Sequence, residues 1–215
     1  MINLILIGAQ GSGKGTQAGV LIQRFGIQQL SSGDLFRDAI KQGTALGMEA
    51  KHYMSQGNLV PDTITIKMIL EALAAPLYAN GVILDGFPRT RDQAQALDAA
   101  LPTLHRHIDK AIYLRVPREI LEDRLLNRFV CTIHQHIYNT KTNPPQVEGI
   151  CDIDGSPLIR REDDEPAAIQ RRLTIFFEQT IQVVHYYRTQ NKLIEVDGNL
   201  PIEAVTSELI AAIGM

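Results

Sequence analysis

The chain has 215 residues, of which 45% are hydrophobic and 21% are charged, and its formal net charge is −3. This composition is ordinary for a globular protein, and the length allows one large α/β domain with inserted lobes. The slightly acidic balance argues against a protein that coats nucleic acid, and no apolar run approaches the ~18 residues of a membrane span. The N-terminus enters a strand with no basic flank, so we expect no signal peptide and a cytoplasmic protein.

An apolar run at residues 2–7 predicts a buried strand, and it leads into the sequence GAQGSGKGT at residues 8–16. The glycines leave backbone N–H groups free to point at an anion, and the following helix adds its positive end. Lys14 supplies a point charge for the outer phosphates. The spacing fits a P-loop, although Gly15 stands where most P-loops carry Ser or Thr and the hydroxyl comes one place later, at Thr16. A ligand-free turn is the alternative, and the order of strand, loop and helix disfavours it.

Short helices with polar caps dominate the next part of the chain. Ser31 and Asp34 have capping-box spacing, and Gly26 and Gly57 stand where helix C-caps belong. The pattern predicts a helix over 18–25, a short segment over 27–30, a helix that carries Arg37, a helix over 45–56, a turn over 58–62 and a helix after it. Residues 31–60 are therefore expected to form a small helical lobe.

Two further apolar runs predict strands of the same sheet. The run over 81–85 ends in Asp85, which we expect near metal and phosphates because ligands collect at the carboxyl ends of parallel strands. A turn or helix-cap aspartate is the alternative. Gln93 has capping-box spacing from Thr90, so it could cap its own helix. The run over 110–116 precedes a helix that contains Arg124 and Arg128. Strands that alternate with helices predict a parallel sheet with right-handed crossovers.

Helical periodicity disappears from about residue 129 to residue 164, where turn residues predict a separate, β-rich lobe. This lobe contains Cys131-x-x-His134 and Cys151-x-x-Asp154, whose four side chains can close a tetrahedral zinc site. A hydrogen-bonded cluster without metal is the alternative. His136 has the wrong spacing and is expected to be exposed. A helix over 166–190, a strand over 193–196 and a helix over 202–213 complete the prediction.

Four motifs in this order resemble the long, lidded type of adenylate kinase, among the nucleoside monophosphate kinases, from end to end of the chain. The motifs are the Gly-Lys-Gly-Thr loop at 13–16, Ser31-Ser32-Gly33-Asp34 with Arg37, Asp85-Gly86-Phe87-Pro88-Arg89, and Arg161-Glu162-Asp163-Asp164. The resemblance implies a P-loop NTPase-type parallel sheet flanked by helices. It implies a core at 1–30, 61–126 and 165–215, an AMP-binding lobe at 31–60 and a lid at 127–164, the lobe for which the spacing of Cys131, His134, Cys151 and Asp154 favours zinc. It also implies a monomer that transfers the terminal phosphoryl group of ATP reversibly to AMP, with Mg²⁺, to give two ADP.

The resemblance also assigns roles to single residues. ATP would be held by Gly11, Ser12, Gly13, Lys14, Gly15, Thr16, Arg124, Arg128, Ile137, Tyr138 and Leu200. AMP would be held by Ser32, Arg37, Asn58, Leu59, Val60, Gly86, Phe87, Pro88, Arg89, Gln93, Arg161 and Arg172. The catalytic groups would be Lys14, Arg89, Arg124, Arg128, Arg161 and Arg172, with Asp85 orienting the hydrated magnesium. Gln10, Ser32 and Thr142 depart from residues that are commoner in the family, and the departure at Thr142 concerns selectivity for the donor base.

Two other functions compete with this interpretation. One is a kinase for another monophosphate such as UMP or GMP, against which Ser32, Arg37 and Gln93 favour AMP. The other is a regulatory or nucleic-acid-binding P-loop protein whose zinc site docks a partner. The acidic lid argues against nucleic acid, and a GTPase switch would require Asp-x-x-Gly after the second strand, where this chain has Asp85-Gly86-Phe87-Pro88.

Overall fold

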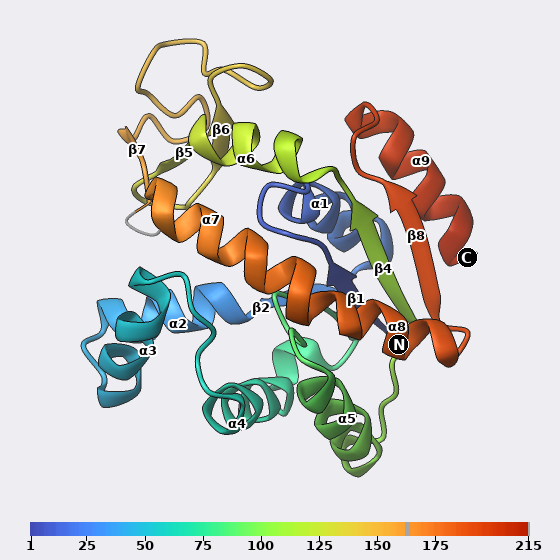
Figure 1. The fold of residues 1–215 in the computed structure, drawn as a ribbon. Coiled ribbons are helices and arrows are strands. Elements are labelled where there is room, and N and C mark those ends of the chain that lie inside the picture. The colour runs from blue at the N-terminus through green and yellow to red at the C-terminus, as the bar shows by residue number, and fades with distance from the viewer. Residues whose placement is uncertain (162–163, 215) are drawn as a thin grey trace.

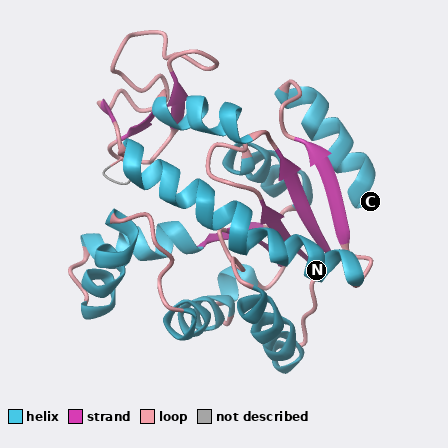
Figure 2. Cartoon of the chain, viewed as in Figure 1, coloured by secondary structure: helices cyan, strands magenta, loops and turns pink. Residues whose placement is uncertain are grey.

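The computed structural model describes residues 1–161 and 164–214, and a parallel sheet lies at the centre of this part of the chain. The sheet has five strands in the order β2-β3-β1-β4-β8, and every neighbouring pair is parallel. Its strands are β1 (Ile2–Ile7), β2 (Gln28–Ser31), β3 (Gly81–Asp85), β4 (Lys110–Arg115) and β8 (Leu193–Asp197). Helices flank the sheet (Figures 1 and 2), so the predicted α/β fold with a central parallel sheet is confirmed.

The core consists of two apolar layers, one on each face of the sheet. Leu4 and Leu6 of β1 pack with helices α1 (Lys14–Phe25) and α9 (Ile202–Ile213). Ile5 and Ile7 point to the other face, as alternation along a strand requires. That face is covered by α4 (Asp62–Leu73), α5 (Arg91–Ala100), α6 (Arg118–Leu126), α7 (Pro166–Ile175) and α8 (Ile181–Thr189). The first strand and its loop are thus held rigidly between both layers.

A small helical unit follows β2. It contains α2 (Ser32–Lys41) and α3 (Ala45–Ser55), which share the apolar cluster of Phe36, Ala50 and Val60. The Ser31 hydroxyl accepts the backbone N–H of Asp34, as the capping-box spacing predicts. Short 3₁₀ turns at Pro76–Tyr78 and Leu101–Leu104 connect other elements of the core.

A second, antiparallel sheet is formed by β5 (Arg128–Cys131), β6 (Ile137–Asn139) and β7 (Leu158–Ile159), in the order β6-β5-β7. The prediction that Arg128 lies on a helix is wrong, because α6 ends at Leu126 and the backbone of Arg128 pairs with Asn139. Figure 1 shows this sheet at the upper left and α2 and α3 at the lower left, on opposite sides of α7.

The helix expected over residues 166–190 is interrupted in the structure. A π-helical turn at Phe176–Thr180 separates α7 from α8. Its extra residue rotates α8 relative to α7. Ile169 and Leu173 before the turn, and Val183 and Tyr187 after it, can therefore all face the same core layer. Across the described residues, we find no helix with the length and apolar character needed to cross a membrane.

Candidate active site

A cavity of about 1330 Å³ lies at the carboxyl ends of the parallel strands. The P-loop forms its floor, and β6, α2 and α7 contribute to its walls. Most of the predicted site residues line it: Gly11, Ser12, Gly13, Lys14, Gly15, Thr16, Arg37, Asn58, Leu59, Asp85, Gly86, Pro88, Arg89, Arg124, Arg128, Ile137, Tyr138, Arg161, Arg172 and Leu200. Residues from distant parts of the sequence therefore share one space.

Four predicted AMP contacts are buried and do not line this cavity: Ser32, Val60, Phe87 and Gln93. Ser32 Oγ donates a hydrogen bond to Gly86 O at 2.6 Å. Gln93 Nε2 donates to Asp62 Oδ1 at 2.6 Å, and Gln93 Oε1 accepts the backbone N–H of Arg89 at 2.7 Å. In this structure these polar groups support the Gly86–Arg89 wall from behind.

The P-loop has the backbone that its glycines predict. Gly13 has a φ of +93° and acts as the N-cap of α1, so this position favours glycine. At Gly8 any Cβ would overlap Ser12 Oγ, because the loop closes tightly on itself. The N-terminus of α1 consequently faces the cavity with its free N–H groups.

Lys14 is half-buried and is held against the loop that precedes it. Its Nζ donates hydrogen bonds to Gly8 O at 2.7 Å and Ala9 O at 3.0 Å. Burial lowers the pKa of Lys14 to about 8, with the Arg89 and Arg128 guanidiniums acting in the same direction and the Asp85 carboxylate in the opposite one. Binding of an anion next to this ammonium would therefore be strongly favourable.

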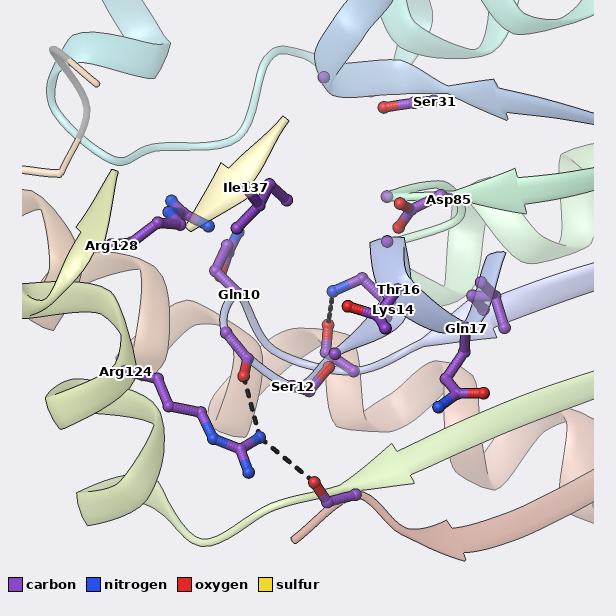
Figure 3. Close-up of a pocket in the computed structure, with 18 of the residues that line it drawn as sticks. Gln10, Ser12, Lys14, Thr16, Gln17, Ser31, Asp85, Arg124, Arg128 and Ile137 are labelled. Carbon is purple, nitrogen blue, oxygen red and sulfur yellow. Dashed lines mark hydrogen bonds between the residues drawn. The ribbon is translucent and has the colours of Figure 1, made fainter. Parts of the chain in front are cut away.

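Arginines from two helices and a strand surround the loop. Arg124 of α6 donates hydrogen bonds to Gly11 O and Gly198 O, each at 3.2 Å, and Figure 3 shows it spanning these two segments. Arg128 of β5 and Arg172 of α7 are both buried, and both form ion pairs with the same carboxylate, that of Asp164.

Asp164 belongs to a sequence motif that assigns it no role, and in the structure its buried carboxylate holds two of the site arginines. Its oxygens accept from Arg128 Nε at 2.8 Å, Arg128 Nη2 at 2.6 Å and Arg172 Nη2 at 2.7 Å. Burial alone would raise the pKa of Asp164, but the two guanidiniums hold it below its usual range. The sequence holds one indication of this role: Asp164 stands in the same short motif as Arg161. Glu162 and Asp163 of that motif lie outside the described residues.

Gln29 is a second residue of the cavity that no sequence motif indicates. It lies on β2, and its Nε2 donates to Asp85 Oδ2 at 2.9 Å. Both side chains line the cavity. Only the parallel pairing of β2 with β3 brings them together, so no local pattern could have indicated the contact.

A cluster of possible metal ligands lies in the second sheet and its turns. Its members are Cys131, His136, Cys151 and Asp154, whose ligand atoms all lie within 4.8 Å of one another. His136 Nδ1 lies 3.4 Å from each of Cys131 Sγ, Cys151 Sγ and Asp154 Oδ2, and Cys131 Sγ lies 3.4 Å from Asp154 Oδ2. Both cysteines are buried free thiols.

This cluster differs from the predicted ligand set in its histidine. His136 faces the two sulfurs with 29% of its side chain exposed. His134 is 63% exposed, and its contacts in the cluster are with Asp154 Oδ2, at 2.9 Å, and with the ring of His136. The reason is a turn after Cys131, in which Gln135 takes a φ of +58° and the N–H of His136 points back to Cys131 Sγ at 3.2 Å. The prediction that His136 is exposed by its spacing is wrong.

A parallel sheet whose first strand enters a P-loop beneath a group of cations defines a P-loop protein that binds nucleotide phosphates. The family model described as adenylate kinase matches residues 6–192. Adenylate kinases from Exiguobacterium sibiricum and Oceanobacillus iheyensis are each 45% identical to this chain, over 99% and 97% of both sequences respectively. The adenylate kinase of Staphylococcus epidermidis is 44% identical over 97% of both. The chain belongs to the adenylate kinase family.

Proposed function

We propose that this chain catalyses the reversible transfer of the terminal phosphoryl group of ATP to AMP, which gives two ADP. One observation carries the proposal: Lys14 and six arginines converge on a single cavity above the P-loop, in a member of the adenylate kinase family. The arginines are Arg37, Arg89, Arg124, Arg128, Arg161 and Arg172.

The chemistry explains why so many cations are needed. Two nucleotides that meet through their phosphates bring several negative charges together, and the transferred phosphoryl group spreads its charge over three equatorial oxygens. A phosphate oxygen of AMP attacks in line, so no side chain has to act as a nucleophile. Guanidiniums bind such oxygens bidentately, and Lys14 contributes a point charge. Catalysis then consists of positioning and preorganised charge.

Different walls of the cavity would bind the two nucleotides. The P-loop, with Arg124, Arg128, Ile137, Tyr138 and Leu200, would hold ATP. Arg37, Arg89, Asn58, Leu59 and the Gly86–Arg89 wall would hold AMP, while Arg161 and Arg172 would contact both phosphate groups. Closure of the lobe at 31–60 and of the lid over this space would exclude water, the competing nucleophile.

The residues at the floor suit a magnesium ion that enters with ATP. The Asp85 carboxylate and the Thr16 hydroxyl line the same cavity and offer the hard oxygen ligands, direct or through water, that this ion prefers. When bound, the ion would neutralise charge on the outer phosphates. Gln29 holds one oxygen of Asp85 with a neutral amide and so leaves the full negative charge of the carboxylate in place.

A coupled assay of ADP formation from ATP tests the substrates, with AMP, GMP, UMP and CMP offered in turn. We expect AMP to be the fastest acceptor. Arg37→Ala and Arg89→Ala should each raise the Michaelis constant for AMP and lower turnover, because each removes a charge-assisted contact to its phosphate. If GMP or UMP is phosphorylated faster than AMP, the proposal that AMP is the acceptor is wrong.

We also propose that the lid holds a structural zinc ion through Cys131, His136, Cys151 and Asp154. Zinc bonds of ~2.0–2.3 Å give a tetrahedron with edges of about 3.3–3.8 Å. Four of the six edges in this cluster measure 3.4 Å. All four positions are filled by protein groups, which is the arrangement of a zinc ion that stabilises structure and does not catalyse.

Elemental analysis and a matched pair of variants test the zinc proposal. We expect about one zinc per chain in the purified protein. His136→Ala should lose most of the metal, whereas His134→Ala should keep it, because His134 is mostly exposed and contacts Asp154 and the His136 ring from outside the cluster. If His134→Ala loses the metal and His136→Ala keeps it, His134 is the ligand. If the wild-type protein contains no metal, the zinc site is refuted.

We further propose a monomer that works in the cytoplasm. The two cysteines support a reducing compartment, since they lie together as free thiols and offer ligands for zinc. Light scattering coupled to gel filtration should give the mass of one chain, 23.9 kDa.

A further inference from the structure

Tyr138 contacts both the cavity and the proposed zinc site, and the proposed ligand His136 also lines the cavity. Tyr138 lies on β6 with only 5% of its surface exposed, and it packs against Cys131, Cys151 and Leu158. The same residue also lines the cavity. One side chain therefore belongs to the nucleotide side of the lid and to the metal side.

The hydroxyl of Tyr138 has two hydrogen-bond partners, a backbone N–H and a sulfur. Its oxygen accepts the backbone N–H of Asp152 at 2.8 Å, and it lies 3.5 Å from Cys151 Sγ. A zinc-bound cysteine is a thiolate and carries no proton. The hydrogen of the phenol must therefore point to the sulfur when the metal is present, while the Asp152 N–H holds the oxygen in place.

The two cysteines receive different support within the described residues. Cys131 Sγ accepts a backbone N–H from His136, at 3.2 Å. Cys151 Sγ contacts His136, which is a proposed ligand itself, and the Tyr138 hydroxyl. The hydroxyl thus takes the place at Cys151 that a backbone N–H takes at Cys131.

We propose that Tyr138 is a positioning residue of the zinc site, which donates a hydrogen bond from its hydroxyl to the Cys151 thiolate and so couples the metal to the nucleotide-facing strand of the lid. This inference rests on the zinc site proposed above. Partners of this kind orient a ligand and disperse its charge, and their loss typically weakens metal binding by about 10–100-fold.

The test compares the wild-type chain with Tyr138→Phe, which removes one oxygen atom and keeps the ring. Tyr113→Phe is the control, because Tyr113 is similarly buried but lies on β4, in the main sheet. Zinc affinity is measured by competition with a chelator of known affinity. Cobalt(II) is then substituted, and its thiolate charge-transfer absorption is recorded. We expect Tyr138→Phe to bind zinc about 10–100-fold more weakly and to shift the cobalt absorption, while Tyr113→Phe matches the wild type.

Equal zinc affinity and equal cobalt spectra in Tyr138→Phe and the wild type would overturn the inference and leave the zinc site intact. A wild-type chain that binds no zinc would overturn both. Melting curves of the wild type and of Tyr138→Phe, recorded with zinc and with excess chelator, show whether the substitution acts on the fold alone. If Tyr138→Phe lowers the melting temperature equally in both conditions and leaves the zinc affinity unchanged, the hydroxyl serves packing and not the metal.

Discussion

The ammonium group of Lys14 lies in an electrostatically unfavourable environment. Its ammonium is partly desolvated among other cations, which lowers its pKa to about 8, yet it bonds only to loop carbonyls among the contacts recorded for it. The ammonium is stabilised most when an anion binds beside it. This stabilisation increases as negative charge develops in the transition state.

Lys14→Met should abolish most of the phosphoryl transfer and leave the fold intact. Methionine fills similar space without charge, so we expect turnover to fall by about 10²–10³-fold or more. The melting temperature should stay within a few degrees of the wild type. Turnover near the wild-type value would contradict the assignment of the P-loop.

Binding of ATP should take up a proton at about pH 8.5. In the free protein Lys14 is largely deprotonated above its pKa of about 8, and the bound phosphates raise that pKa because they favour the charged form. At about pH 6.5 both states carry the ammonium, so this uptake should vanish and affinity should be higher. Calorimetry in two buffers of different ionisation enthalpy measures the uptake, and Lys14→Met should lack it.

Gln29→Leu should weaken the response of the enzyme to magnesium more than its binding of AMP. The leucine keeps the volume but removes the amide that holds Asp85 Oδ2, so the carboxylate loses its orientation. We expect a several-fold higher magnesium concentration for half-maximal turnover and an unchanged Michaelis constant for AMP. Binding of Mn²⁺·ATP, followed by electron paramagnetic resonance, is a second measurement. Equal losses in every parameter would indicate a general structural defect.

Strand β5 and helix α7 are joined through Asp164, which lies between them in the sequence. Its buried carboxylate binds Arg128 of β5 and Arg172 of α7 at once. Two cations that would otherwise repel each other are thereby held at the rim of the cavity, ready to contact phosphates.

Asp164→Asn should destabilise the protein and slow the reaction. The amide cannot balance two buried guanidiniums, and removal of one partner of a buried ion pair costs about 3–5 kcal/mol. We expect a clear drop in melting temperature and lower turnover. Asp123→Asn is the control, because its ion pair with Lys141 is exposed and should contribute little. Similar melting temperatures for the two variants would show that the carboxylate is not needed to hold the arginines.

Buried apolar residues are distributed unevenly over the described part of the molecule. The two faces of the parallel sheet carry large apolar clusters, whereas the cluster of the second sheet contains only Cys131, Tyr138 and Cys151 among the buried residues that the structure describes, with Leu158 beside them. Two of these are proposed zinc ligands, so the metal would supply stability that apolar burial does not.

Removal of the metal should therefore loosen residues 128–159 before the core. After chelation, or in Cys151→Ser, we expect backbone amides of β5–β7 to exchange hydrogen much faster, while those of β1, β3 and β4 keep their protection. Hydrogen exchange by mass spectrometry measures both regions in one sample. Uniform protection after complete metal loss would contradict the stabilising role.

Much of the molecule was predictable because the signals are local. The strand at residues 2–7, the P-loop and the cap at Ser31 depend on short patterns and on backbone conformations that particular residues favour. Arg128 was placed on a helix because periodicity alone cannot show where α6 stops and an antiparallel pairing begins. The π-helical turn after Ile175 leaves no distinct pattern either.

The sequence by itself determined the class of fold, the phosphate-binding loop and the cations, since these depend on spacing within single segments. Only the tertiary structure decided which side chains meet. It placed Gln29 on Asp85, joined Arg128 and Arg172 through Asp164, and moved His136 into the metal cluster in place of His134. Strand register sets the contact of Gln29 with Asp85, and one left-handed residue, Gln135, sets the place of His136. A change of one residue in register turns a side chain to another face. Asp164 reaches its two arginines only because the fold brings β5 and α7 together.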